Sequence, residues 1–188
     1  AAAAAVDAAG GEAVVAPCDV AIEAEVARAV ERVLTELGPP DLVVNNAGIV
    51  HRGPRVDETD PADWDRVIAV NLRGPFLVAR AFVPVMRARG RGRLVHVASI
   101  SSTIGCANNA SYAASKWGLV GLAKSLAEEL RGTGVVSCAV LPGSVDTEML
   151  AGSGFPPQMT ADDVAATIVW LGFDAPDAVH GSAVEMFG

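Results

Sequence analysis

Short valine-rich apolar runs alternate with longer amphipathic segments along this chain, and this alternation restricts its fold more than any other feature. We expect strands at 13–15, 42–45, 94–98, 135–141 and 182–187, and helices at 1–9, 21–37, 61–89, 112–131 and 161–171. Strands that alternate with helices build crossover units around a parallel sheet, with helices on both faces. We therefore predict an α/β fold of the Rossmann type, a doubly wound and mainly parallel sheet, in a single domain over residues 1–188.

Turn and cap residues support these boundaries. Asp19 and Thr160 are suited to begin the helices that follow them, because their side chains accept hydrogen bonds from free backbone N–H groups. Gly90-Arg91-Gly92 is a typical helix end. Pro75 and Pro84 lie inside the helix expected at 61–89 and predict a bend or a break there.

Composition excludes several classes of protein. The 188 residues are 51% hydrophobic, enough for one substantial core, and the net charge of −8 with scattered basic residues argues against a nucleic-acid binder. We see no apolar run near the ~18–20 residues of a membrane span, and the alanine-rich start lacks the features of a signal peptide. We expect no metal site and no disulfide framework, and hence a reducing cytoplasm, from three widely spaced cysteines: Cys18, Cys106 and Cys138.

Tyr112 and Lys116 carry the clearest chemical signal. They are four residues apart at the start of a predicted helix, so they share one helix face. Lowering the pKa of a tyrosine by roughly three units takes about 4 kcal/mol, which one charge at ~4 Å supplies at an effective dielectric of ~20. The pair therefore predicts a proton donor or acceptor near neutral pH. Taken alone, it also fits a surface tyrosine beside a solvated lysine.

Polar residues follow the expected strands where those strands end. Asn45-Asn46-Ala47-Gly48 ends one strand, and Ser99 ends the next, 13 residues before Tyr112. Asn71 interrupts an apolar stretch, and the segment 141–147 ends a third strand with a Pro-Gly turn. Each feature alone fits an ordinary turn or loop. Because open α/β sheets bind ligands at the carboxyl ends of their strands, the set in this order indicates one site.

In these residues the chain resembles the short-chain dehydrogenase/reductase family, from about residue 13 to residue 188. The matching motifs are Cys18-Asp19-Val20, Asn45-Asn46-Ala47-Gly48, Asn71, Ser99, Tyr112-x-x-x-Lys116 and Pro142-Gly143. The resemblance implies an oxidoreductase that transfers a hydride between a nicotinamide cofactor and a secondary alcohol or ketone. The sequence leaves NAD and NADP open, since the residues that mostly set this choice follow a strand that we do not find.

The resemblance also assigns roles to individual residues. Tyr112 would be the general acid/base, and Ser99 would hydrogen-bond the substrate oxygen. Lys116 would lower the pKa of Tyr112 and bind the nicotinamide ribose, and Asn71 would hold a water that links Lys116 to solvent. The spacing to Tyr112 favours Ser99 over its neighbours Ser101 and Ser102. The implied cofactor contacts are Asp19 and Val20 at the adenine, Asn46, Ala47 and Gly48 at the adenosine ribose, Tyr112 and Lys116 at the nicotinamide ribose, Pro142 and Gly143 beside it, and Val145 and Thr147 at the carboxamide.

The chain departs from the family pattern at its start. The family opens with a strand, a glycine-rich TGxxxGxG turn, a helix and a second strand, and we find none of these in the sequence. The strand at 13–15 would be the family's third, so we expect an N-terminally incomplete domain whose first two strands are absent. A non-catalytic relative, or a short form that cannot bind the dinucleotide and serves association, is the alternative. An epimerase or lyase reaction on the same tyrosine and lysine is a further one.

Two more regions bear on substrate and assembly. The segment between Thr147 and Thr160 would cover a small, open cleft, and residues 106–109 would line it; each segment also fits an ordinary loop. Members of the family commonly assemble through the two helices at 61–89 and 112–131. We therefore expect a homodimer or homotetramer with a small-molecule carbonyl or alcohol substrate and no nucleic-acid or membrane partner. The residues that suggest this contact are Phe82, Val83, Ala113, Gly118, Gly121 and Ala123.

Overall fold

The computed structural model describes residues 2–188, which form a four-stranded sheet in the order β1-β2-β3-β4. Every neighbouring pair is parallel, and Val95 lies opposite Val44 on one side and Cys138 on the other. The prediction of a mainly parallel sheet is confirmed. The strands are β1 (Leu42–Asn45), β2 (Gly92–Val97), β3 (Val135–Pro142) and β4 (Ala183–Met186).

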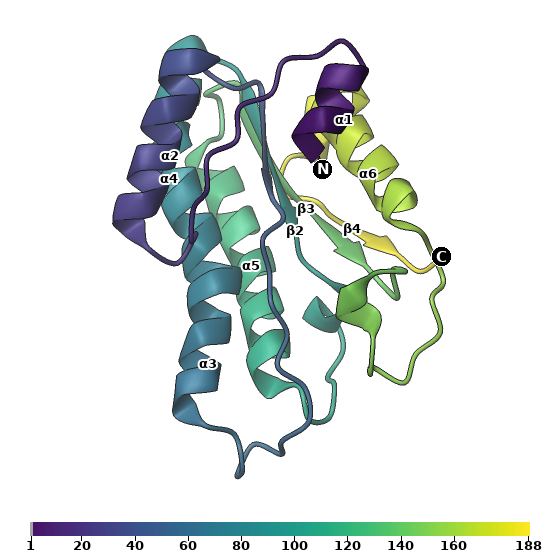
Figure 1. Cartoon of the computed structure of the whole chain (residues 1–188). Coiled ribbons are helices and arrows are strands. Elements are labelled where there is room, and N and C mark those ends of the chain that lie inside the picture. Colours follow the sequence, from purple (N-terminus) through teal and green to yellow (C-terminus); the bar gives the residue numbers. More distant parts are fainter. Residues whose placement is uncertain (1) are drawn as a thin grey trace.

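Helices cover both faces of this sheet, as Figure 1 shows, so the fold is doubly wound. Successive residues of a strand point to opposite faces, and β2 therefore serves two cores. Leu94 packs with Leu77 and Met86 under one helical layer, while Val95 packs with Leu171 under the other. The first layer holds α2 (Glu23–Glu36), α4 (Gly74–Arg89) and α5 (Ala110–Glu129), and the second holds α6 (Ala161–Val169).

A continuous helical path runs from α3 (Pro61–Ile68) through the π-helical turn η1 (Ala69–Arg73) into α4. Pro75 lies in the first turn of α4, directly after this wide turn, so the expected irregularity occurs just before it. The break expected at Pro84 is wrong, because α4 continues through it to Arg89. Phe82 and Met86 on either side of that proline are buried in the core, and their packing holds the helix together.

The helical path Pro61–Arg89 corrects one expectation from composition. By length and composition it is apolar enough to cross a membrane, although no such run was expected. Its apolar residues Leu77, Ala79, Phe82 and Met86 are buried together with β1 and β2 in one core cluster. The apolar character of this helix is therefore used in packing against the sheet.

The N-terminal segment differs from prediction. The strand expected at 13–15 is wrong, since a strand needs a hydrogen-bonded neighbour and β1 pairs only with β2 among residues 2–188. Instead, the Val15 carbonyl accepts a hydrogen bond from Nη1 of Arg32 at 2.9 Å. The helix expected at 1–9 is α1 (Ala2–Ala8), and Ala1 lies outside the described residues.

Helix ends follow local capping chemistry, with one exception. Gly90 ends α4 at φ 66°, a left-handed conformation that glycine adopts without strain. Thr160 and Asp163 form a reciprocal capping box at the start of α6. Asp19 does not cap α2, which begins at Glu23, because its carboxylate accepts from the Ala21 N–H in the turn before the helix.

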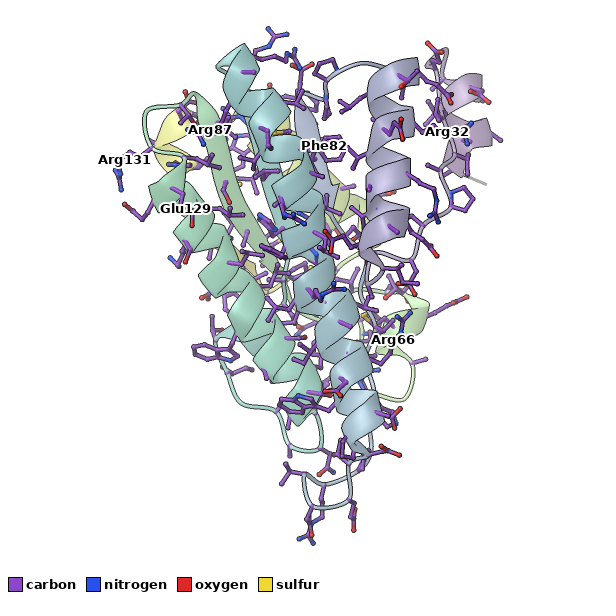
Figure 2. All side chains as sticks on the ribbon, turned by 90° about the vertical axis from the view of Figure 1, so that its left-hand side faces the viewer. Arg32, Arg66, Phe82, Arg87, Glu129 and Arg131 are labelled. Atoms are coloured by element: carbon purple, nitrogen blue, oxygen red, sulfur yellow. The ribbon has the colours of Figure 1, made fainter. Side chains whose placement is uncertain are left out.

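Several residues expected at a subunit contact are used inside the molecule. Phe82 is buried in the core between α4 and its neighbours, where Figure 2 labels it in the α2–α4–α5 layer. Ala123 is buried against β3, and a Cβ at Gly118 would approach Leu72 to 2.8 Å, so both serve internal packing. Gly121 alone of these small residues has open space where its Cβ would lie.

Candidate active site

The carboxyl ends of three parallel strands and the start of α5 converge on Tyr112 and Lys116. The ammonium of Lys116 donates a hydrogen bond to the Val97 carbonyl at the end of β2, at 2.8 Å. A Cβ built on Gly48, in the loop after β1, would lie 3.6 Å from the same nitrogen. The topology therefore joins the lysine to loops that are distant in sequence.

Ser99, Tyr112 and Lys116 form the centre of the site. Tyr112 and Ser99 are close enough for the serine side chain to lower the tyrosine pKa, and Lys116 Nζ lies 5.6 Å from the centroid of the tyrosine ring. Ser99 Oγ also accepts from the Ser101 N–H at 3.1 Å, which fixes it at the start of the short turn η2 (Ile100–Ser102). Of the three serines, Ser99 is the one that meets Tyr112, as the 13-residue spacing indicates.

The charge balance at Tyr112 differs from expectation. Burial raises its pKa, while the Ser99 side chain and the positive charge of Arg52 act in the opposite direction. The lowering by Lys116 that the resemblance implies stays a prediction: the ammonium lies 5.6 Å from the centroid of the ring and donates to the Val97 carbonyl. Burial also lowers the pKa of Lys116 to about 8. Tyr112 therefore keeps its proton at neutral pH.

Asn71 acts as a clamp through its side-chain amide. Its Oδ1 accepts from the Ile49 N–H at 2.8 Å, and its Nδ2 donates to the Ile49 carbonyl at 2.8 Å and to Ser115 Oγ at 3.1 Å. Ser115 Oγ in turn donates to the Tyr112 carbonyl at 2.7 Å. Both amide hydrogens of Asn71 are thus used to join the loop after β1 to α5.

The backbone carbonyl of Asn71, unlike its side-chain amide, lacks one of its usual hydrogen-bond partners. Pro75 has no N–H, so the Asn71 carbonyl lacks the donor that an α-helix normally provides four residues on. The π-helical turn η1 lies at this position, and such turns are frequent at functional sites. The Asn71 carbonyl therefore cannot make the usual α-helical bond to residue 75.

The predicted cofactor residues lie around the carboxyl edge of the sheet, in two groups. Val20, Asn46 and Ala47 line a small cleft of about 80 Å³ beside β1. Asp19 does not line this cleft, and its carboxylate pairs with Arg66 at 3.0 Å. The second group follows β3. Pro142 ends that strand, and the Gly143 N–H donates to the Met186 carbonyl. Val145 forms a β-bridge with Met159, and Thr147 directly precedes the turn η3 (Glu148–Leu150).

These residues fit one half of a nicotinamide dinucleotide. Gly48 lies beside Lys116 and Asn71, and a Cβ built on it would be 3.6 Å from Lys116 Nζ and 3.5 Å from Asn71 Oδ1. Any larger side chain would therefore enter the space next to these polar atoms. That space suits a ribose approaching the lysine. The sequence contains no glycine-rich phosphate turn, so the described residues offer no cradle for the pyrophosphate.

Arg52 and Ser115 belong to the site and were missed from the sequence. Arg52 Nη1 donates to the Met149 carbonyl at 2.6 Å, so the loop after β1 is tied to the turn η3 after β3. Neither residue carries a motif. The sequence offered two weak signals: the cation Arg52 lies four residues after Gly48, and Ser115 lies between Tyr112 and Lys116 on the same helix.

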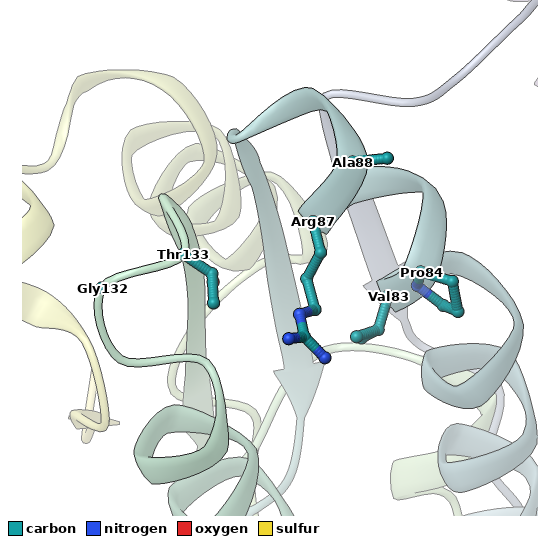
Figure 3. Close-up of a pocket in the computed structure, with 6 residues that line it drawn as sticks. All are labelled: Val83, Pro84, Arg87, Ala88, Gly132 and Thr133. Atoms are coloured by element: carbon teal, nitrogen blue, oxygen red, sulfur yellow. The ribbon is translucent and has the colours of Figure 1, made fainter.

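Another hollow lies away from this site. A groove of about 650 Å³ runs between the C-terminal half of α4 and the turn after α5, with Val83 and Arg87 on one side and Thr133 on the other (Figure 3). None of the predicted site residues lines it. Within residues 2–188 we find no group of three or more His, Cys, Asp or Glu side chains arranged to hold a metal ion.

Comparison with known proteins decides the family. The family model described as short chain dehydrogenase matches residues 1–154. The chain belongs to the short-chain dehydrogenase family. Like other members of that family, this short-chain dehydrogenase has the parallel Rossmann-like sheet described above.

Two relatives and one solved structure illustrate the similarity. This short-chain dehydrogenase is 41% identical over 141 residues to a short chain dehydrogenase of Pseudocercospora fijiensis, covering 74% of this chain and 46% of that one. It is 34% identical over 184 residues to a D-threitol dehydrogenase of Mycolicibacterium smegmatis, covering 91% and 70%. Its structure matches a gluconate 5-dehydrogenase of Burkholderia cenocepacia in complex with NADP and tartrate, with TM-score 0.92, 29% identity and coverage of 99% and 78%. The match thus spans about half the length of the first relative.

Proposed function

We propose that this short-chain dehydrogenase interconverts a secondary alcohol and a ketone with NAD or NADP. The observation that carries the proposal is the pair of Tyr112 and Ser99 hydroxyls, one helical turn from the buried Lys116. The D-threitol dehydrogenase and the NADP-bound gluconate 5-dehydrogenase support an alcohol substrate and a nicotinamide cofactor.

The residues act on the substrate oxygen. Reduction of a ketone builds negative charge on that oxygen, and two hydroxyls aimed at it stabilise the transition state. Burial keeps Tyr112 protonated, so it donates the proton to the developing alkoxide, while Ser99 donates a hydrogen bond. The nicotinamide supplies the hydride when it is bound. Lys116 would hold the nicotinamide ribose, Asn46, Ala47 and Gly48 the adenosine ribose, and Val145 and Thr147 the carboxamide side.

Tyr112 must then regain its proton. Lys116 lies one turn away with a pKa of about 8, so it can release and take up a proton near neutral pH. The Asn71 carbonyl, freed by Pro75, would bind the water that connects Lys116 to solvent. The Asn71 amide holds this geometry in place through Ile49 and Ser115.

Tyr112→Phe tests the proposal because it removes one oxygen and leaves the ring. We expect kcat for reduction of the ketones that correspond to threitol and gluconate, followed by the loss of reduced-nicotinamide absorbance, to fall by about 10²–10⁴-fold. Cofactor affinity, measured by calorimetry, should change little. Ser101→Ala is the matched control and should retain activity, since Ser99, not Ser101, is the serine that lowers the Tyr112 pKa. Full activity in Tyr112→Phe would refute the proton-donor role.

We also propose a homodimer or homotetramer through α4 and α5, in a reducing cytoplasm. Phe76 on α4 is 47% exposed and Trp117 on α5 is 52% exposed, which leaves an apolar face on this layer. The three cysteines are all unpaired, as suits a reducing compartment. Trp117→Glu should convert the assembly to monomers in light scattering; an unchanged mass would refute this contact.

A further inference from the structure

Arg52 is fixed in place by one end of its guanidinium. Its Nη1 donates to the Met149 carbonyl at 2.6 Å and to the Ala151 carbonyl at 3.4 Å. The next residue, Gly53, donates its N–H to the Asn108 carbonyl in the loop before α5, at 3.4 Å. Three loops at the carboxyl edge of the sheet therefore meet at Arg52, and the side chain is half-buried between them.

The other edge of the same guanidinium is free. Nε and Nη2 of Arg52 have no acceptor among residues 2–188, and no carboxylate of the described chain lies within 4.0 Å. This edge carries two parallel N–H donors, the fork that matches a carboxylate in a planar bidentate pair. A free fork on an arginine that is already held in position is suited to bind a ligand carboxylate.

Arg55, in the same loop, shows what this fork does when a carboxylate is present. Its Nε donates to Asp57 Oδ1 at 3.2 Å and its Nη2 donates to Asp57 Oδ2 at 3.3 Å. The same two atoms are open on Arg52. The loop thus contains one arginine whose fork is occupied from within the chain and one whose fork is available.

The position and the charge of Arg52 relate it to the reacting group. Its charge lowers the pKa of Tyr112, so its field reaches the phenol. The protein as a whole has a net charge of −8, which repels anions. An anionic substrate therefore needs a local cation at the cleft, and Arg52 is a cation without an acidic partner in the described part of the chain.

We propose that Arg52 is a specificity-determining residue that binds a carboxylate of the substrate through Nε and Nη2. The substrate class is then a hydroxy acid whose secondary hydroxyl reaches Tyr112 and Ser99 while its carboxylate meets Arg52. This inference rests on the proposed function, because it concerns the substrate of the same site.

Matched acid and alcohol probes test the inference. We would measure binding by calorimetry and turnover by reduced-nicotinamide absorbance for gluconate against glucitol and for threonate against threitol. Binding is measured with and without the oxidised cofactor. The wild type should bind each acid about tenfold or more tightly than its neutral partner. Arg52→Gln should abolish that preference, and Arg52→Lys, which keeps the charge without the fork, should keep part of it.

Controls separate a carboxylate site from a structural role. Arg55→Gln removes a neighbouring arginine whose fork is already occupied, and it should leave the acid preference unchanged. Arg52→Gln also loses the hydrogen bonds to Met149 and Ala151, and loosening that segment would weaken acids and neutral alcohols by the same factor. An equal loss for both classes, or no acid preference in the wild type, would overturn the inference.

The inference and the proposed function fail in different ways. Arg52-dependent binding of acids without any hydride transfer would support the carboxylate site and refute the oxidoreductase. Turnover that depends on Tyr112 but treats acids and neutral alcohols alike would support the oxidoreductase and refute the role of Arg52.

Discussion

His96 lies in a buried polar row that crosses the sheet, and its protonation is expected to destabilise the fold in acid. Nδ2 of Asn45 is 3.2 Å from His96 Nδ1, and His96 Nε2 is 3.4 Å from Ser137 Oγ. Ser137 Oγ donates to the Ala123 carbonyl at 2.9 Å, so it must accept from Nε2–H. The row therefore requires the neutral tautomer with its proton on Nε2. A second proton on Nδ1 would face the Asn45 amide donor.

The size of this acid destabilisation follows from the burial of His96. His96 is fully buried, and burial lowers its pKa from 6.5 to about 4. At about 1.4 kcal/mol per pKa unit, charging His96 in the folded state costs about 3 kcal/mol. The unfolded chain takes up this proton near pH 6.5 and the folded chain only near pH 4, so the free energy of unfolding falls as pH decreases through that window. This loss is a large part of a typical stability of about 5–15 kcal/mol.

Urea unfolding at about pH 7 and about pH 4.5 measures the effect. The wild type should lose roughly 2 kcal/mol between these values, and His96→Gln, which cannot titrate, should lose much less. His51→Gln is the matched control, a histidine substitution at a partly exposed site outside the buried row. Asp19, Glu128 and Asp163 have lowered pKa values and are present in both proteins, so their contribution to the pH dependence cancels in this comparison. Equal pH slopes in the wild type and His96→Gln would refute the reasoning.

Three further substitutions follow from single contacts. Asn71→Leu should destabilise the protein by about 2–4 kcal/mol in chemical denaturation, because it leaves the Ile49 N–H and carbonyl without their partner; a loss below about 1 kcal/mol would contradict the clamp. Gly134→Ala should lower Tm strongly, since its Cβ would lie 1.9 Å from the Gly90 carbonyl oxygen at φ 78°; an unchanged Tm would show that this turn relaxes. Lys116→Met should abolish turnover yet raise the free energy of unfolding by about 1–2 kcal/mol at pH 7, because burial disfavours the ammonium and holds its pKa at about 8. This gain should shrink as pH rises from 8 towards 10.5, where the wild-type lysine is neutral in the folded state. A lower stability of the variant at pH 7 would refute this.

The strands and the catalytic spacing were readable from the sequence because they depend on near neighbours. A valine-rich run ended by Asn or Pro-Gly identifies a strand from within a few residues, and all four observed strands begin and end within two residues of their predicted bounds. Ser99, Tyr112 and Lys116 were found in the same way, because helix periodicity and a fixed spacing place them.

Other outcomes depended on partners far along the chain. The segment 13–15 has the composition of a strand, but among the described residues no neighbouring strand pairs with it. Phe82 fits an exposed helix face by pattern, yet the packing of α2, α4 and the sheet buries it. A local sequence pattern indicates which structure a segment prefers, and packing against distant segments decides whether that structure forms.

The sequence by itself identified the family, the parallel α/β fold and Tyr112 as the candidate proton-transfer residue. Only the tertiary structure decided the direction of the Tyr112 pKa shift, the clamp made by Asn71 and the free fork of Arg52. Periodicity and spacing are local and are therefore visible in one dimension. Burial, desolvation and hydrogen bonds between residues 22 to 99 positions apart exist only after the chain has folded.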